Sequence, residues 1–267
     1  MKWMELVPSD FEKLAREESV CIVPMGSLER HGEHIPFGCD CVTVETISAL
    51  AAEIEPAVVF PTFFFGQVHE ASIFSGTINF PPEMLISMLR QTLNEIARNG
   101  FKKIIIFSGH GGNSDLLRLF DMATLEEKKD YTLYPIPSTE GILTPEETAQ
   151  KLAILDTYYG HACEWETSLY MGCKPGLVKL EKQCYPEPIA PEKRMPDLPG
   201  VQSALWWYAE CPRNVAGSPS LATEEKGKKL LDLYVNAFVR LLKKIKQDEV
   251  VPQMQKEFYE RYDRVGK

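Results

Sequence analysis

Short, continuous apolar runs bounded by polar residues predict four strands that are buried on both faces. The clearest run is residues 103–107, and residues 20–25 form a second one directly after a charged segment. Residues 57–60 and 131–136 are further strand candidates. Proline has no N–H to donate to a sheet, so Pro24 predicts that the strand beginning at residue 20 ends there.

Apolar residues at helical spacing fill the stretches between these strands and continue after the last one. The predicted helices span residues 41–54, 81–99, 114–127, 145–155, 161–172 and 223–247. Strands that alternate with helices predict an α/β fold whose largely parallel sheet is covered on both faces. Residues 183–200 are rich in proline and charge and predict a surface excursion, and we expect the charged tail after residue 248 to form an arm.

Length, charge and cysteine usage narrow the class of protein. The chain has 267 residues, which fits one large domain, and 29 Lys and Arg against 38 Asp and Glu give a net charge of −9. That balance disfavours nonspecific binding to nucleic acid or to an anionic membrane. The sequence shows no signal-like leader and no apolar stretch of transmembrane length, so we expect a cytoplasmic protein. Seven scattered cysteines without a Cys-x-x-Cys pair disfavour a disulfide framework.

Metal-ligating residue types gather in the stretch 27–40, which follows the predicted strand at 20–25. Within it lie Glu29, His31, Glu33, His34 and Asp40. Imidazole nitrogen and carboxylate oxygen are ligands for divalent metals, and ligands of α/β proteins bind at the carboxyl ends of the strands. The alternative is a polar surface loop with unrelated charges. The density of ligand types favours a metal site.

A glycine-rich turn follows the clearest predicted strand and contains His110, Gly111, Gly112 and Asn113. The glycines allow close approach of the backbone, which would place His110 at the same end of the sheet as the stretch 27–40. The alternative is phosphate binding by the turn at a helix N-terminus, but the chain has neither a Walker lysine nor a Gly-x-Gly-x-x-Gly motif. Asn113 could instead cap the following helix.

A third cluster contains His161, Glu164 and Glu166 at the start of a predicted helix. On a regular helix His161 and Glu164 share a face, whereas His161 and Glu166 lie about 140° apart. If His161 and Glu166 act together, His161 must therefore precede the helix. The alternative for either glutamate is a favourable interaction with the helix macrodipole.

At these three clusters the chain resembles the creatininase (creatinine amidohydrolase) family. The motifs that carry the resemblance are residues 24–36 with Asp40, then 109–113, then 161–168, with weaker matches at 74–77 and 218–227. The resemblance implies a three-layer α/β/α fold and a homo-oligomer, often a hexamer. It also implies a small-molecule substrate and a centre of two divalent metal ions, which are zinc, manganese or iron.

The resemblance also assigns roles to individual residues. It implies that Glu29 and His110 hold one metal, that His31 holds the other, and that Asp40 bridges them. Glu166 is expected to be a further ligand or to orient the attacking water, and His161 to act as general acid or base. The residues expected to contact substrate are His34, Glu70, Gly111, Gly112 and Asn113.

The expected activity is hydrolysis of a non-peptide C–N bond, in an amide or cyclic amide, by metal-activated water. Creatininase itself carries a glutamate ligand two residues after the histidine that matches His110, and Gly112 at that position argues against creatinine as the substrate. Alternatives within the family are hydrolysis of a formamide, of a C–C bond in a cyclic diketone, or of a peptide. Outside it, a metal-binding module without turnover and a nucleotide-binding module remain open.

Overall fold

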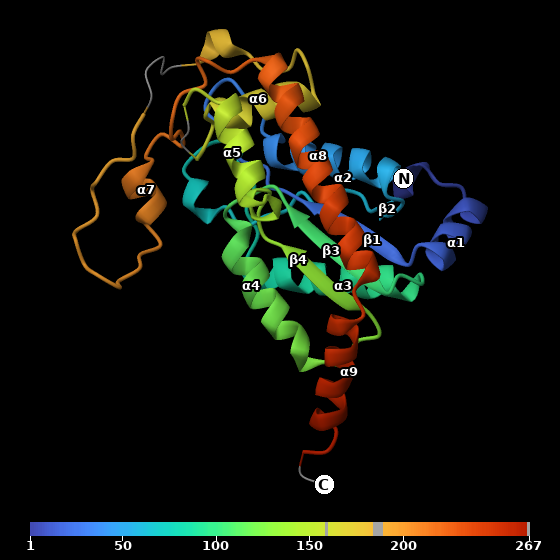
Figure 1. Ribbon diagram of the computed structural model, residues 1–267. Helices are drawn as coiled ribbons and strands as arrows, with labels where there is room; N and C mark the ends of the chain where they lie inside the picture. Colours follow the sequence, from blue (N-terminus) through green and yellow to red (C-terminus); the bar gives the residue numbers. More distant parts are fainter. Residues whose placement is uncertain (158–159, 184–188, 266–267) are drawn as a thin grey trace.

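A four-stranded parallel sheet forms the middle of the computed structural model, which describes residues 1–157, 160–183 and 189–265 (Figure 1). Its order is β2 (Val58–Val59), β1 (Val20–Met25), β3 (Lys103–Ser108) and β4 (Thr132–Ile136). All four predicted strands are confirmed. The expectation that the first strand ends at Pro24 was wrong, because Pro24 pairs with Phe107 and the strand continues to Met25.

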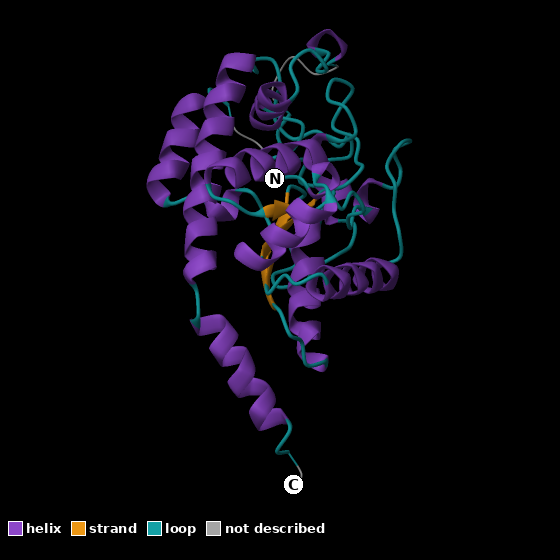
Figure 2. Cartoon of the chain, turned by 90° about the vertical axis from the view of Figure 1, so that its right-hand side faces the viewer, coloured by secondary structure: helices purple, strands orange, loops and turns teal. Residues whose placement is uncertain are grey.

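Helices cover both faces of the sheet, so the fold is a three-layer α/β/α sandwich as predicted (Figures 1 and 2). Alternate residues of β1 belong to different cores: Val20 and Ile22 pack with one helical layer, and Cys21 and Val23 with the other. The first layer consists of α2 (Cys39–Ile54), α5 (Pro145–Ile154), α6 (Glu164–Cys173) and α8 (Glu224–Gln247). The second consists of α1 (Pro8–Glu17), α3 (Pro82–Arg98) and α4 (Asn113–Ala123).

Two further helices lie outside these layers. Helix α7 (Trp206–Glu210) belongs to the excursion on the left of Figure 1, and α9 (Val250–Tyr262) extends away from the body in both views. The expected charged arm is thus a helix, held by the buried Tyr259, whose hydroxyl donates to the carbonyl of Glu127 at 2.6 Å. Short 3-10 helices are η1 (Trp3–Glu5), η2 (His69–Ala71), η3 (Thr124–Glu126), η4 (Glu140–Ile142) and η5 (Leu180–Lys182). Residues 184–188 of the predicted excursion lie outside the described residues.

The topology brings two of the predicted motifs to the same end of the sheet. Strands β1 and β3 are parallel neighbours with Met25 opposite Ser108, so the segments that follow them leave side by side. Gly109 donates its N–H to the carbonyl of Met25 at 2.9 Å. A Cβ on Gly109 would lie 2.5 Å from the carbonyl oxygen of Asp40, so only glycine lets the turn after β3 approach the start of α2 this closely.

Two expectations from composition can be compared with the described part of the chain. None of its helices combines the length and the apolar character needed to cross a bilayer. The six cysteines within it are free thiols, five of them buried. The chain segment that the structure describes is therefore held together by packing and hydrogen bonds, without disulfides.

Candidate metal centre and active site

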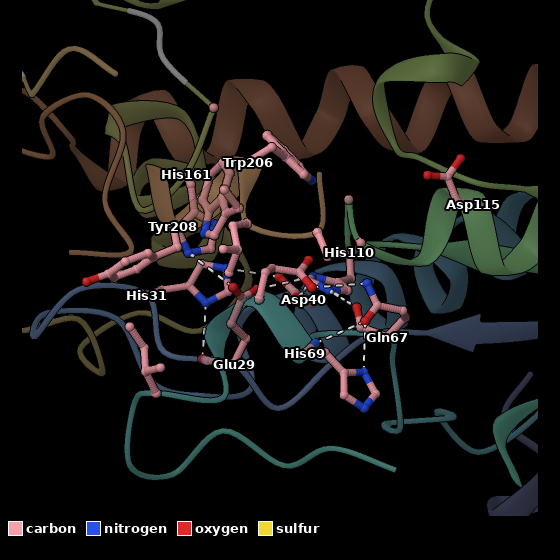
Figure 3. Close-up of a pocket in the computed structure, with 18 of the residues that line it drawn as sticks. Glu29, His31, Asp40, Gln67, His69, His110, Asp115, His161, Trp206 and Tyr208 are labelled. Carbon is pink, nitrogen blue, oxygen red and sulfur yellow. Dashed lines mark hydrogen bonds and ion pairs between the residues drawn. The ribbon is translucent and has the colours of Figure 1, made fainter. Parts of the chain in front are cut away.

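Two imidazole rings are oriented by backbone carbonyls so that one nitrogen of each remains available as a ligand. His31 Nδ1 donates to the carbonyl of Glu29 at 3.2 Å, and His110 Nε2 donates to the carbonyl of Gln67 at 2.8 Å. These bonds leave the other nitrogen of each ring, His31 Nε2 and His110 Nδ1, directed into the site (Figure 3). Metal-ligating histidines are held in this way by a hydrogen bond from the second ring nitrogen.

Asp40 lies between the two rings. Its carboxylate projects from the first turn of α2 and is buried. One oxygen, Oδ1, lies 3.1 Å from His31 Nε2, and the other, Oδ2, lies 3.0 Å from His110 Nδ1. Each oxygen thus faces a different imidazole, which is the arrangement that a carboxylate bridging two cations requires.

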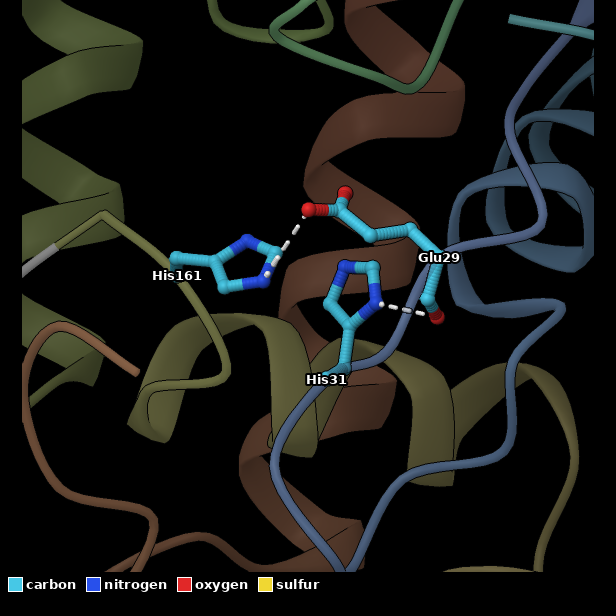
Figure 4. A group of neighbouring side chains, drawn as sticks. All are labelled: Glu29, His31 and His161. Carbon is cyan, nitrogen blue, oxygen red and sulfur yellow. Dashed lines mark hydrogen bonds and ion pairs between the residues drawn. The ribbon is translucent and has the colours of Figure 1, made fainter. Parts of the chain in front are cut away.

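Glu29 completes the cluster from the segment after β1. Its Oε2 lies 3.2 Å from His110 Nδ1, and its Oε1 lies 3.6 Å from Nε2 of His161 (Figure 4). Three atoms here, Glu29 Oε2, His31 Nε2 and Asp40 Oδ2, are buried and make no hydrogen bond of acceptable geometry. Because unsatisfied buried polar atoms are costly, their convergence fits a divalent cation as the missing partner.

Mutual attraction keeps these groups charged despite burial. Burial disfavours the cationic form of His31, but the carboxylates of Asp40, Glu166 and Glu29 together outweigh it and raise the pKa of His31 to about 10. Burial also opposes charge on His110, and Glu29 and Asp40 hold its pKa well above the usual value. The histidines in turn lower the pKa of both acids against the effect of burial. A bound cation would replace the protons on the imidazoles and neutralise the same carboxylates.

Three overlapping sets of side chains have donor atoms within 4.8 Å of one another in the described part of the chain. The sets are Glu29 with Asp40 and His110, Glu29 with His31 and His161, and His31 with Cys39 and Asp40. The resemblance implied one metal on Glu29, His110 and Asp40 and a second on His31 and Asp40. The first and third sets are compatible with that division. Cys39 was not predicted here; its only signal in the sequence is its position directly before Asp40.

Glu166 and His161 lie beside this cluster. Glu166 Oε2 accepts the backbone N–H of Ala162 at 2.5 Å and lies 3.8 Å from His31 Nε2 and 3.9 Å from His161 Nδ1. Burial raises the pKa of Glu166, although the histidines oppose the shift. His161 precedes α6, and Ala162 between them has a φ of 52°, so the histidine lies before the helix, as the joint action of His161 and Glu166 required.

Glu164 takes a different direction from Glu166. Its carboxylate is fully buried, accepts the backbone N–H groups of Asp156 and Thr157, and forms an ion pair with Lys226. These contacts hold the start of α6 against α8. Of the two glutamates considered in the sequence, Glu166 therefore faces the cluster and Glu164 stabilises the fold around it.

The cluster lies in a cavity of about 780 Å³, large enough for a drug-sized molecule. Glu70, Gly111 and Gly112, which were expected to contact substrate, line it together with His69 and Asp115. The opposite wall comes from α7 and the residues before it, and includes Trp206 and Trp207, for which the sequence favours core packing over a role in lining a pocket. Its members are Ala204, Leu205, Trp206, Trp207 and Tyr208.

Two residues expected to contact substrate lie elsewhere. His34 Nε2 pairs with the Thr167 hydroxyl at 3.1 Å, and burial, followed by the positive charge of His31, lowers the pKa of His34 to about 4. Asn113 is fully buried, accepts the N–H of Gln67 and donates to Ser108 Oγ. Neither side chain lines the cavity, because both are directed into the packing between the loops. Asn113 also makes no side-chain cap for α4.

Comparisons with known proteins bear on the family of the chain. The family model described as creatinine amidohydrolase matches residues 4–242. A creatinine amidohydrolase of Pseudomonas putida is 25% identical over 191 residues, which cover 67% of this chain and 74% of that protein. A mycofactocin precursor peptide peptidase of Mycobacterium tuberculosis is 25% identical, with 88% and 89% covered. A 3-dehydro-scyllo-inosose hydrolase of Thermotoga maritima is 24% identical, with 84% and 76% covered.

Solved structures share the fold. A creatininase described as the Zn–Zn type superimposes with a TM-score of 0.77 at 21% identity and covers 92% of this chain and 98% of its own. A creatininase with manganese gives a TM-score of 0.75 at 22% identity, with 92% and 99% covered. At such low identity these likenesses show the architecture alone, whereas the family model spans most of the sequence. The chain therefore belongs to the creatininase family.

Proposed function

We propose that this protein is a metal-dependent hydrolase that uses two divalent ions, of zinc, manganese or iron, to cleave a non-peptide C–N bond in a small polar substrate. The observation that carries the proposal is the placement of Asp40, whose two oxygens face two different imidazole nitrogens at 3.1 and 3.0 Å. The unsatisfied buried atoms around Asp40 support the same conclusion.

In this proposal Glu29, His110 and Asp40 hold one ion, and His31 and Asp40 hold the other. When bound, the ions lower the pKa of a water molecule and polarise the carbonyl group of the substrate. Glu166 completes the ligand set beside His31 or orients the attacking water, in keeping with its 3.8 Å distance from His31 Nε2. The buried side chains exclude competing water from this end of the cavity.

His161 is the proposed proton donor to the leaving nitrogen. It lies next to the cluster, with Nε2 3.6 Å from Glu29 and Nδ1 3.9 Å from Glu166, and it lines the cavity. A histidine in this position can take a proton from the attacking water and give it to the leaving group. Transfer to the nitrogen matters because an amide nitrogen leaves poorly unless it is protonated.

The substrate is proposed to be a small amide or cyclic amide, but the cavity favours one second candidate. Its volume of about 780 Å³ and its aromatic wall leave room for a chain much longer than a small ring. The relative from Mycobacterium tuberculosis, which covers 88% of this chain, is described as a peptidase. Cleavage near the end of a short peptide is therefore the second candidate.

Turnover by metal-loaded and metal-stripped protein tests the proposal. The panel holds linear amides, lactams, formamides, a cyclic diketone and short peptides, with products identified by mass spectrometry. We expect hydrolysis of an amide or lactam that chelation abolishes and that zinc or manganese restores. Hydrolysis of peptides alone would favour the second candidate, and loaded protein that turns over no member of the panel would contradict the proposal.

We further infer that a single domain assembles as a homo-oligomer in the cytoplasm, for which a hexamer is one size that the resemblance implies, and binds neither nucleic acid nor membranes. Large apolar side chains exposed on α4 and η3 support assembly, namely Leu119, Met122 and Leu125. The molar mass from light scattering tests this directly. A monomer at micromolar concentration would contradict it.

A further inference from the structure

A buried asparagine connects the aromatic wall of the cavity to the proposed metal ligands. The indole N–H of Trp207, on α7, donates to Oδ1 of Asn214 at 2.5 Å. Asn214 is fully buried, and the Trp207 ring also lies edge-on to His161 with 5.4 Å between ring centroids. No motif in the sequence indicates a role for Asn214, which lies far along the chain from the three predicted clusters.

The amide nitrogen of Asn214, which is its hydrogen-bond donor, faces the proposed metal centre. Its Nδ2 donates to Glu29 Oε1 at 3.0 Å and to the carbonyl of Arg30 at 2.6 Å, and lies 3.1 Å from His161 Nε2. The Trp207 indole can only donate, so it requires Oδ1 on its own side and thereby fixes Nδ2 toward Glu29. Glu29 Oε1 is held in this way, while Oε2 faces His110 and the proposed metal position.

The backbone at Asn214 is itself unusual. Its φ of 53° lies in the left-handed region, which a non-glycine residue adopts at a cost and which asparagine tolerates better than most. The chain after it pairs with the segment before α6, because Ala216 and His161 exchange both backbone hydrogen bonds, at 3.3 and 2.8 Å. A strained residue at a site argues for a constraint at that point.

We propose that Asn214 is a positioning residue that couples the placement of α7 over the cavity to the orientation of Glu29. The hydrogen bond from Trp207 fixes the orientation of the Asn214 amide. The amide in turn holds Oε1 of Glu29, so that Oε2 is the oxygen left to bind the metal. The inference rests on the proposed metal centre and adds to it a connection between the substrate-facing wall and a ligand. Hydrogen bonds to a ligating carboxylate typically change metal affinity by about 10- to 100-fold when removed.

The test measures zinc affinity by competition with a chelating dye, without substrate, in the full-length protein. Asn214→Gly removes the amide and suits a φ of 53°, so the backbone is not strained further. Trp207→Phe keeps an aromatic ring but removes the indole N–H. The control, Trp3→Phe, makes the same exchange at a residue that packs on Phe11, Phe60 and Phe101 and does not line the cavity. Melting temperatures of the metal-free proteins check that each variant folds.

We expect Asn214→Gly to bind zinc about 10- to 100-fold more weakly than wild type, Trp207→Phe to bind it more weakly to a smaller extent, and Trp3→Phe to match wild type. If Trp207 acts through Asn214, the double variant loses no more affinity than Asn214→Gly alone. Additive losses would overturn the coupling and indicate independent packing roles.

Unchanged zinc affinity in Asn214→Gly, with wild type fully loaded, would overturn this inference and leave the proposed function standing. Absence of zinc binding by wild type would overturn both. The two failures are thus distinguished by the wild-type protein alone.

Discussion

Acidification is expected to weaken the fold through His34 before the carboxylates protonate. Burial, followed by the positive charge of His31, lowers the pKa of His34 to about 4, from its ordinary value of 6.5. The unfolded chain therefore takes up a proton on His34 near its ordinary pKa, whereas the folded chain keeps the ring neutral. The resulting stabilisation is complete above about pH 6.5 and is lost as the pH falls toward about 4.

The magnitude follows from the shift. Between about pH 7.5 and about pH 5, the unfolded chain binds one more proton than the folded chain over about 1.5 pH units. That difference lowers the free energy of unfolding by about 2 kcal/mol. Urea unfolding of wild type and of His34→Gln at the two pH values, both in EDTA, isolates this contribution. Glutamine does not titrate and can still bond to the Thr167 hydroxyl that His34 contacts.

We expect the stability advantage of wild type over His34→Gln to shrink by about 2 kcal/mol on going from the higher to the lower pH. Parallel behaviour of the two proteins, within about 0.5 kcal/mol, would refute the reasoning. It would mean that His34 titrates normally and is accessible, as contact with a substrate would require.

Two further substitutions test neighbouring contacts. Gly112→Ala should weaken metal binding about 10- to 100-fold, because a Cβ there would lie 2.6 Å from His110 Nε2 and disturb the hydrogen bond that orients this ring. Gly111→Ala is the matched control, since nothing lies within 4 Å of its Cβ. It should bind metal normally in the same dye assay. Glu164→Gln should cost about 1.5–3 kcal/mol of unfolding free energy, because it weakens the charged hydrogen bond with Lys226 while Asp156 remains as a partner of that lysine. Burial opposes the charge of Glu164, but hydrogen bonds from Lys226 and the backbone outweigh burial and lower the pKa of Glu164. Urea unfolding should therefore show the loss of stability in Glu164→Gln above about pH 4.5, and the loss should disappear in acid. An equal loss of stability at low pH would contradict this assignment.

The sequence predicted the elements whose signal is local and strong. The apolar runs predicted β1 and β3 correctly. Both strands are buried on two faces, so their sequences are continuously apolar and do not alternate. The metal centre could be predicted from the sequence for a topological reason. Neighbouring parallel strands end at the same edge of the sheet, so His31 and His110 meet although they are far apart in the chain. Helical geometry also limited how His161 and Glu166 could act together.

What the sequence did not predict depends on long-range contacts. Asn214 carries no motif, and its proposed role arises only because the chain returns to Glu29 across a sequence separation of 185 residues. His34 and Asn113 stand within the predicted motifs, but their side-chain directions are set by loop conformation and not by spacing. The segment after residue 248 was predicted to be an arm from its charge, whereas the contact of the buried Tyr259 that holds α9 depends on residues far away in the sequence.

Elemental analysis of the purified protein beside Asp40→Asn tests the central claim most directly. Asparagine preserves the shape of Asp40 but removes the charge and one of the oxygens that face His31 and His110. The account predicts about two equivalents of zinc, manganese or iron in wild type and a sharp loss in the variant, with both proteins folded by circular dichroism. Wild type that neither contains nor takes up metal, or a variant that retains both equivalents, would contradict a centre bridged by Asp40.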